Sequence, residues 1–95
     1  MTVLKRTESG ISITGHAGYA EHGKDIVCAA VSILAQNLIQ SIEELTEDKI
    51  EYELSPGEVN INFRDLSAEA MLLFDSFYIG VKMIADEYPE NVTIE

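Results

Sequence analysis

Residues 50–64 read IEYELSPGEVNINFR, the stretch of this chain in which apolar and polar side chains alternate most regularly. A two-residue period places alternate side chains on opposite faces of a β-strand, and the Pro56-Gly57 pair at the centre favours a turn. The apolar set is Ile50, Tyr52 and Leu54 before the turn and Val59, Ile61 and Phe63 after it. The stretch therefore predicts a β-hairpin in which each strand turns one face to a core and the other to water.

A long helix is expected on each side of this hairpin. The first runs from Ile26 to about Leu45, with apolar positions that recur every three or four residues: Ala30, Ile33, Leu34, Leu38, Ile42 and Leu45. The second begins near Asp65 or Ser67, either of which can cap a helix, and Pro89 ends it. Its apolar stripe consists of Ala70, Leu73, Phe74, Phe77, Val81, Ile84 and Ala85. Both helices are therefore predicted to be amphipathic.

Three short strands complete the expected fold. Val3–Glu8 and Ile11–Thr14 lie on either side of a Ser9-Gly10 turn, which predicts a further hairpin, and residues 92–94 form a last strand. The order is then ββαββαβ, and both apolar stripes are buried if the helices pack on one face of a mostly antiparallel sheet. We expect a two-layer α+β fold that forms a single domain over residues 1–95. The order of the strands within the sheet does not follow from the sequence.

The composition limits the possible functions. Six Lys and Arg stand against seventeen Asp and Glu, which gives a net charge of −11. This excess of acidic residues excludes general electrostatic binding to nucleic-acid phosphates, which needs a basic patch. It either favours encounter with a basic partner or serves only the solubility of the protein. We expect no membrane span, since no run of about 18 apolar residues occurs, and no signal peptide. One cysteine cannot form an internal disulfide, so we expect a cytoplasmic protein.

The chemistry of the chain is concentrated in residues 15–32. They read GHAGYAEHGKDIVCAAVS and hold both histidines and the only cysteine. Asp25 precedes the first helix and can cap it by accepting a hydrogen bond from the backbone N–H of Val27 or Cys28. Cys28 then lies in the first helical turn, where the positive end of the helix dipole favours a thiolate and the Asp25 carboxylate opposes one. A thiolate beside an imidazole makes a nucleophile and its base.

Two histidines compete for the role of base. His16 follows a strand, which fixes its position, whereas His22 lies in the loop, so we prefer His16. Gly18 and Gly23 allow this loop to fold over a substrate and to move. An ordinary flexible connection would have the same composition.

The residues around Cys28 have further candidate roles. Asp25 either orients the imidazole in a Cys-His-acid arrangement or only caps the helix, which is the simpler interpretation. Ser32 lies one turn beyond Cys28 on the same helical face, where it bonds near the thiolate or back to a helix carbonyl. The backbone N–H groups at the helix start are candidates for holding an oxyanion.

Two non-catalytic interpretations of these residues remain open. Taken alone, Cys28 is a small apolar side chain of a kind that is usually buried. His16, His22, Asp25 and Cys28 are all possible zinc ligands, but their spacing matches no common zinc site. We therefore expect neither a metal nor a cofactor.

Two segments of this region, GHAGY at 15–19 and GKDIVCAAVS at 23–32, resemble the signature of the ribosomal-processing cysteine protease (Prp) family. The resemblance extends over the whole domain in length and in the order of elements. It implies that Cys28 is the nucleophile and His16 the base, with Asp25 and Ser32 as supporting residues.

The resemblance also implies a mobile loop over residues 17–24 that admits the substrate. The residues of this loop that are expected to meet the substrate are Gly18, Tyr19, His22 and Gly23. Many proteins of the family have a further glycine where Ala20 stands here, so this loop would be slightly less mobile than theirs.

Members of this family are bacterial cytosolic endopeptidases and homodimers. They remove a short N-terminal extension from large-subunit ribosomal protein twenty-seven, cutting after two phenylalanines and before a lysine-rich segment. The resemblance therefore implies a cysteine endopeptidase needed for ribosome assembly, with no nucleic-acid or membrane partner. The acidic charge would attract the basic segment of the substrate. The alternative is a non-catalytic acidic module that binds a basic ribosomal protein or an assembly intermediate.

Overall fold

The computed structural model describes residues 1–21 and 24–95 of the chain. Over these residues the order of elements is ββαββαβ, as predicted. The strands are β1 (Thr2–Thr7), β2 (Gly10–Thr14), β3 (Ile50–Ser55), β4 (Glu58–Phe63) and β5 (Val92–Ile94), and the helices are α1 (Ile26–Leu45) and α2 (Ala68–Glu87).

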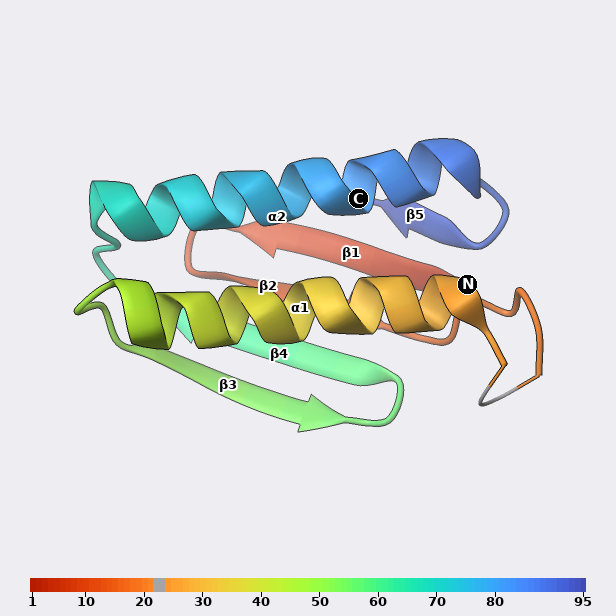
Figure 1. The fold of residues 1–95 in the computed structure, drawn as a ribbon, viewed down its shortest axis with the longest axis horizontal. Coiled ribbons are helices and arrows are strands. Elements are labelled where there is room, and N and C mark those ends of the chain that lie inside the picture. The colour runs from red at the N-terminus through yellow and green to blue at the C-terminus, as the bar shows by residue number, and fades with distance from the viewer. Residues whose placement is uncertain (22–23) are drawn as a thin grey trace.

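The five strands form one mixed sheet in the order β3-β4-β2-β1-β5. All neighbours are antiparallel except β1 and β5, which are parallel. The two helices lie side by side on the same face of the sheet, so the molecule has two layers (Figure 1). The predicted α+β class with a mostly antiparallel sheet is confirmed.

The first hairpin turns one residue earlier than predicted. The turn residues are Glu8 and Ser9, and Gly10 already belongs to β2. Gly10 lies opposite Asn62 of β4, and a Cβ at this position would collide with the carbonyl oxygen of Ile61. Glycine is therefore required here for the close approach of two strands, which the sequence alone presents as a turn signal.

Both helices begin at a capping side chain. The Asp25 carboxylate accepts from the N–H groups of Val27 and Cys28, which confirms the predicted cap of α1. Of the two candidates for α2, Ser67 is the cap, and its hydroxyl accepts from the N–H of Ala70 at 3.1 Å. α2 ends two residues before Pro89, as expected.

The core lies between the sheet and the inner sides of the helices. Its largest fully buried side chains are Phe74, Leu4, Ile42, Ile61, Val27, Val81 and Val92. The predicted stripe of α2 is confirmed: four of its members are buried and the other three pack against the core. Phe63 and Phe74 contact each other with ring centroids 4.8 Å apart, which ties β4 to α2.

The predicted stripe of α1 is wrong at Ile33 and Leu45, whose side chains are 62% and 71% exposed. The buried side of the helix consists of Val27, Val31, Ala35, Leu38, Ile39 and Ile42. Apolar side chains occupy most of the circumference of α1, so a three-to-four spacing fits more than one face. The position of the sheet decides which of these faces becomes core.

By length and composition α1 could cross a membrane, with a mean hydropathy of 1.5. The core helix of a soluble protein has the same properties. In this fold the buried side of α1 packs against the sheet and α2.

The strand β3 lies at the edge of the sheet, beside α1 rather than beneath it (Figure 1). Tyr52 and Leu54 are 43% and 48% exposed, although the alternation predicted that they face a core. The hairpin forms where expected, but of the apolar side chains of β3 only Ile50 packs against the core. A groove opens between α1 and the β3–β4 hairpin and continues to the start of α1 and the end of β2.

Candidate active site

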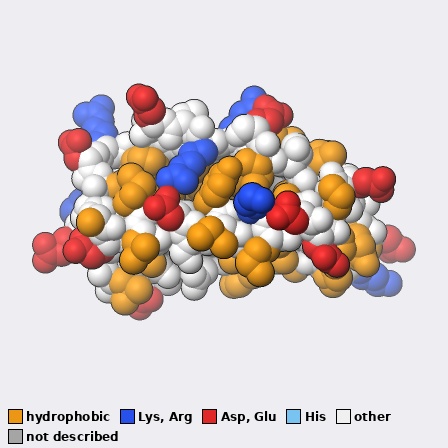
Figure 2. Space-filling model, turned by 90° about the horizontal axis from the view of Figure 1, so that it is seen from above, with side chains coloured by type: hydrophobic (Ala, Val, Ile, Leu, Met, Phe, Trp, Pro, Cys, Tyr) orange, Lys and Arg blue, Asp and Glu red, His pale blue; other side chains and the backbone are white. Residues whose placement is uncertain are grey.

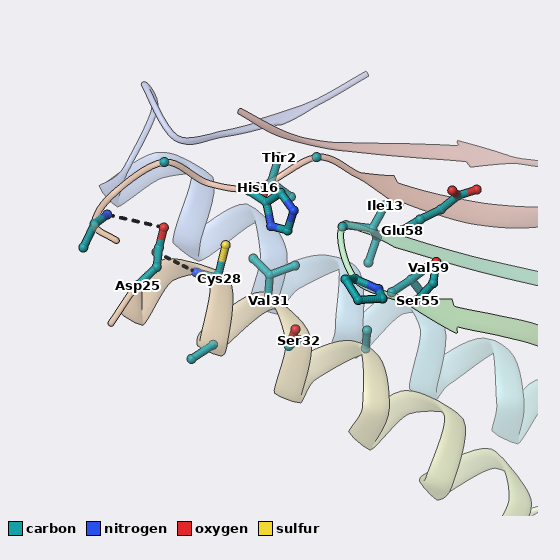
Figure 3. A pocket seen from close by; sticks show the side chains of 17 residues that line it. Thr2, Ile13, His16, Asp25, Cys28, Val31, Ser32, Ser55, Glu58 and Val59 are labelled. Atoms are coloured by element: carbon teal, nitrogen blue, oxygen red, sulfur yellow. Dashed lines mark hydrogen bonds between the residues drawn. The ribbon is translucent and has the colours of Figure 1, made fainter. Parts of the chain in front are cut away.

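A cleft of about 550 Å³ opens between the end of β2, the start of α1 and the β3–β4 turn. Its polar and charged side chains are Thr2, His16, Asp25, Cys28, Ser32, Ser55 and Glu58, and its apolar ones include Ile13, Val31, Ala35 and Val59. Figure 3 shows the imidazole of His16 and the sulfur of Cys28 in the same part of this cleft. The structure thus brings together the His16, Asp25, Cys28 and Ser32 side chains that the sequence singled out.

Cys28 is the third residue of α1 and is partly buried at the wall of the cleft. Its Sγ accepts a hydrogen bond from the backbone N–H of Ala17 at 3.1 Å. This donor and the helix N-terminus both place partial positive charge near the sulfur, which favours a thiolate. The Cys28 side chain lines the cleft and also packs against the core.

His16 lies two residues after β2 and is exposed. Its imidazole lies over Gly57 of the β3–β4 turn: a Cβ at Gly57 would be 2.9 Å from Nε2. The backbone also connects the two segments, since the Gly15 N–H donates to the Gly57 carbonyl oxygen at 2.8 Å. Gly57 has φ +74°, a conformation that other residues rarely adopt. The absence of a side chain at Gly57 therefore leaves room for the His16 ring.

Asp25 is buried and its carboxylate is surrounded by backbone donors. Oδ1 accepts from Val27 at 3.0 Å and from Cys28 at 2.9 Å, while Oδ2 accepts from Tyr19 at 2.9 Å and from Ala20 at 3.4 Å. The carboxylate thus caps α1 and also holds the preceding loop against the helix start. All of these bonds go to the backbone, which agrees with the simpler of the two interpretations.

The same contacts set the charge state of Asp25. Burial by itself raises the pKa of this carboxyl, but the N–H groups of Cys28, Tyr19, Ala20 and Val27 outweigh that effect, so the pKa of Asp25 is lowered. The carboxylate is therefore firmly ionised at neutral pH.

The N–H groups at the start of α1 are already in use. Those of Val27 and Cys28 donate to the Asp25 side chain, and that of Ala29 donates to the Asp25 carbonyl oxygen at 3.1 Å. The expectation that the helix start holds an oxyanion does not hold for these three groups, because Asp25 occupies them. The Ala17 N–H is a backbone donor that lies directly beside the sulfur.

The loop between β2 and α1 is tied to the far end of α2. The rings of Tyr19 and Tyr88 meet edge to face, with centroids 5.3 Å apart, and the Asn91 side chain donates to the Ala17 carbonyl oxygen at 2.9 Å. Gly18 has φ +71°, a conformation that glycine adopts readily; its predicted mobility stays a prediction. His22 and Gly23 lie outside the described residues, so the choice between the two histidines stays a prediction.

Ser32 lines the cleft one helical turn beyond Cys28, as predicted. Within residues 1–21 and 24–95, no three His, Cys, Asp or Glu side chains are grouped so that they could hold a metal ion. The oxygens of Asp25 are directed at N–H groups instead.

Comparison with known proteins places this arrangement in a family. The sequence model of the family described as Cysteine protease Prp matches residues 2–93. The chain belongs to this family. Its resemblance to the Prp signature is thereby confirmed, and the chain is a cysteine protease rather than a non-catalytic acidic module.

Relatives and solved structures of the Prp family match along nearly the whole chain. The ribosomal processing cysteine protease Prp of Mycoplasma genitalium is 34% identical over 97 residues, which cover 99% of this chain and 94% of the relative. That of Staphylococcus aureus (strain Mu50) is 31% identical over 87 residues, with coverages of 88% and 82%. The crystal structure of S. aureus Prp with a covalently linked product peptide has a TM-score of 0.90 and 25% identity, and covers 99% of this chain and 95% of that one.

The sequence did not reveal three contributors to this Prp site: Gly57, Asn91 and the N–H of Ala17. Gly57 was recognisable only as part of a turn, and Asn91 only as a residue before the last strand. Each acts on a residue far away in the chain, so no local pattern marks it. A structure of the hairpin alone would have placed Gly57, but not the imidazole above it.

Proposed function

We propose that this Prp-family chain removes the N-terminal extension of large-subunit ribosomal protein twenty-seven, with Cys28 as nucleophile and His16 as base. The observation that supports it most is the shared cleft of the two side chains, in which a backbone N–H also contacts the Cys28 sulfur. The relatives described above are ribosomal processing proteases, which supports a ribosomal protein as substrate. We also propose that the protein acts in the cytoplasm.

The proposed reaction proceeds through an acyl-enzyme. His16 takes the thiol proton, and the Cys28 thiolate attacks the scissile carbonyl carbon, so that the carbonyl π electrons move to oxygen. The tetrahedral intermediate collapses, the C–N bond breaks, and the leaving amine receives the proton from His16. Water, deprotonated by the imidazole, then attacks the thioester and releases the peptide acid and the thiol. Asp25 supports these reaction steps by holding the start of α1 and the preceding loop together.

The groove suits the sequence around the proposed cut. Beyond Ser32 the cleft continues into a second hollow of about 280 Å³ that is lined by Ser32, Gln36, Leu54, Ser55 and Val59. The apolar side chains of this groove would bury the two phenylalanines that precede the cut. Glu58 is exposed at the rim of the cleft, where its carboxylate would attract the lysines that follow.

We further propose that the protein is a homodimer, as its family resemblance implies. The outward side of α2 carries Leu72, Ile79 and Met83, which are 60–70% exposed and recur at helical spacing. Figure 2, which views the molecule from the α2 side of Figure 1, shows apolar side chains grouped between charged ones. A second copy would remove this apolar surface from water. Light scattering on Ile79→Asp should show a monomer if this surface is the interface, while Lys82→Ala, on the same helix, should leave the dimer intact.

The direct test of the proposed reaction is a mass spectrum of the host's extended ribosomal protein after incubation with the enzyme. We expect one cut after the aromatic pair with the wild-type chain and none with Cys28→Ala. His16→Ala and His22→Ala, tested separately, assign the base: loss of cleavage only in the His22 variant would contradict the role of His16. Cleavage by Cys28→Ala would refute the mechanism.

A further inference from the structure

The turn between α2 and β5 contacts the loop that joins β2 to α1 on the side away from the cleft. The Asn91 Nδ2 donates to the Ala17 carbonyl oxygen at 2.9 Å, although the two residues are 74 positions apart in the chain. Asn91 is not among the described residues that line the cleft. Its side chain therefore acts on the site through Ala17 and not on the substrate.

Ala17 connects Asn91 to the sulfur of Cys28. Ala17 is 2% exposed, and its two backbone polar groups point to different partners. Its N–H donates to the Cys28 Sγ at 3.1 Å, and its carbonyl oxygen accepts from Asn91. A buried carbonyl needs such a partner, since leaving it unpaired is costly. The Asn91 amide thus fixes the backbone whose N–H is aimed at the nucleophile.

The Asn91 backbone is itself held by the sheet and the helix. Its N–H donates to the Tyr88 carbonyl oxygen at 3.0 Å, and its own carbonyl oxygen accepts from the Thr2 N–H at 2.9 Å. Tyr88 also contacts the Tyr19 ring of the loop. Because these bonds involve the Asn91 main chain, a substitution of its side chain leaves them in place. The side-chain amide can therefore be removed without releasing the turn.

We propose that Asn91 is a positioning residue for Cys28: it orients the Ala17 peptide so that the Ala17 N–H stabilises the thiolate. The proposal rests on the proposed function only in taking Cys28 as the nucleophile. Its effect on the sulfur is a property of the free protein and is measured without a substrate.

The test compares Asn91→Asp and Asn91→Ala with the wild-type chain by iodoacetamide alkylation of Cys28 across pH 5–10. Asn91→Asp keeps the shape of the side chain, replaces the donor with a carboxylate and places it against the Ala17 carbonyl. We expect alkylation at pH 6 to be about threefold slower in both variants, since a profile displaced upward by roughly half a pH unit lowers the thiolate fraction by that factor. For peptide cleavage, kcat should fall while KM stays unchanged, because Asn91 does not contact the cleft.

Asn62→Asp is the matched control, since it makes the same chemical change at an exposed position of β4. If the alkylation profile of Asn62→Asp moved along the pH axis as far as that of Asn91→Asp, the added negative charge alone would explain the effect, and the proposal would be overturned. An unchanged alkylation profile in a folded Asn91 variant would do the same; if Asn91→Asp fails to fold, Asn91→Ala decides. If the wild-type chain cleaves nothing, the proposed function fails, but the alkylation profiles still decide the role of Asn91.

Discussion

At the scale of single residues, the site depends on atoms that lie outside the Cys-His pair. Gly57 carries no side chain, and the His16 ring occupies the space that a Cβ would fill. Asp25 carries a carboxylate whose two oxygens bind the helix start and the loop separately. Both residues act by fixing the position of another group, so their substitution should affect catalysis.

Gly57→Ala should displace the His16 imidazole. The added Cβ would meet Nε2 at 2.9 Å, and displacing His16, the proposed base, should cost about 10- to 100-fold in kcat/KM. Gly18→Ala is the control for backbone strain, because Gly18 has nearly the same φ but nothing within 4 Å of a Cβ. Urea unfolding should show a similar loss for both, about 1–2 kcal/mol. Full peptidase activity of Gly57→Ala would contradict this account of the turn.

The lowered pKa of Asp25 predicts how stability depends on pH. A carboxyl whose pKa is lower in the folded state stabilises the fold at any pH above its unfolded value, about 3.9. This contribution is lost as the pH falls through the lower, folded pKa. Asp25→Asn should therefore lose less stability than the wild type between pH 5 and pH 2, as measured by urea unfolding. Asp86→Asn, in an exposed ion pair with Lys82, should keep the wild-type pH dependence; equal slopes for all three proteins would contradict the role of Asp25.

At the scale of elements, α1 shows that only part of an apolar stripe becomes core. Leu38 and Leu45 belong to the same predicted stripe, yet Leu38 is 3% exposed and Leu45 is 71% exposed. The difference arises because the sheet ends before the last turn of the helix reaches it. The burial of one end of a stripe thus depends on the length of the partner layer.

The variants Leu38→Ala and Leu45→Ala test this placement, because the same change is made at two positions of the same helix. Leu38→Ala should reduce the free energy of unfolding by about 2–5 kcal/mol, because it leaves a cavity in the core. Leu45→Ala should change it by no more than about 0.5 kcal/mol. Equal losses in thermal or urea unfolding would mean that Leu45 is covered, and would contradict the structure of this end of α1.

At the scale of the whole molecule, acidic side chains far outnumber basic ones. The described ion pairs join Lys5 to Glu95, Arg6 to Asp75 and Lys82 to Asp86, and Figure 2 shows basic side chains next to acidic ones. With a net charge of −11, many carboxylates remain without a positive neighbour. The resulting negative field extends beyond the surface and should speed the approach of a lysine-rich substrate.

This field predicts a salt dependence of peptide cleavage. Screening shortens the range of the charges from about 10 Å at 0.1 M salt to about 3 Å at 1 M. The kcat/KM for a peptide with the lysine-rich segment should fall several-fold over this range, while that for an otherwise identical peptide with neutral residues stays nearly constant. A parallel decline for both peptides would instead indicate an effect of salt on the enzyme itself.

The sequence by itself determined the features that depend on neighbouring residues. The two-residue period of 50–64 specifies a hairpin, Asp25 and Ser67 specify helix starts, and the segment around Cys28 identifies the family. Such signals are local because backbone conformation and capping involve groups only a few residues apart.

Only the tertiary structure decided the features that depend on distant pairs. It selected the buried face of α1, left Tyr52 and Leu54 uncovered at the sheet edge, placed Gly57 behind His16, and joined Asn91 to Ala17. These contacts form when layers pack, and a single sequence contains no periodicity that records which residues meet across them. Cys28, the proposed nucleophile, can therefore be singled out in the sequence, while the parts that hold it in place are defined by the packing of the fold.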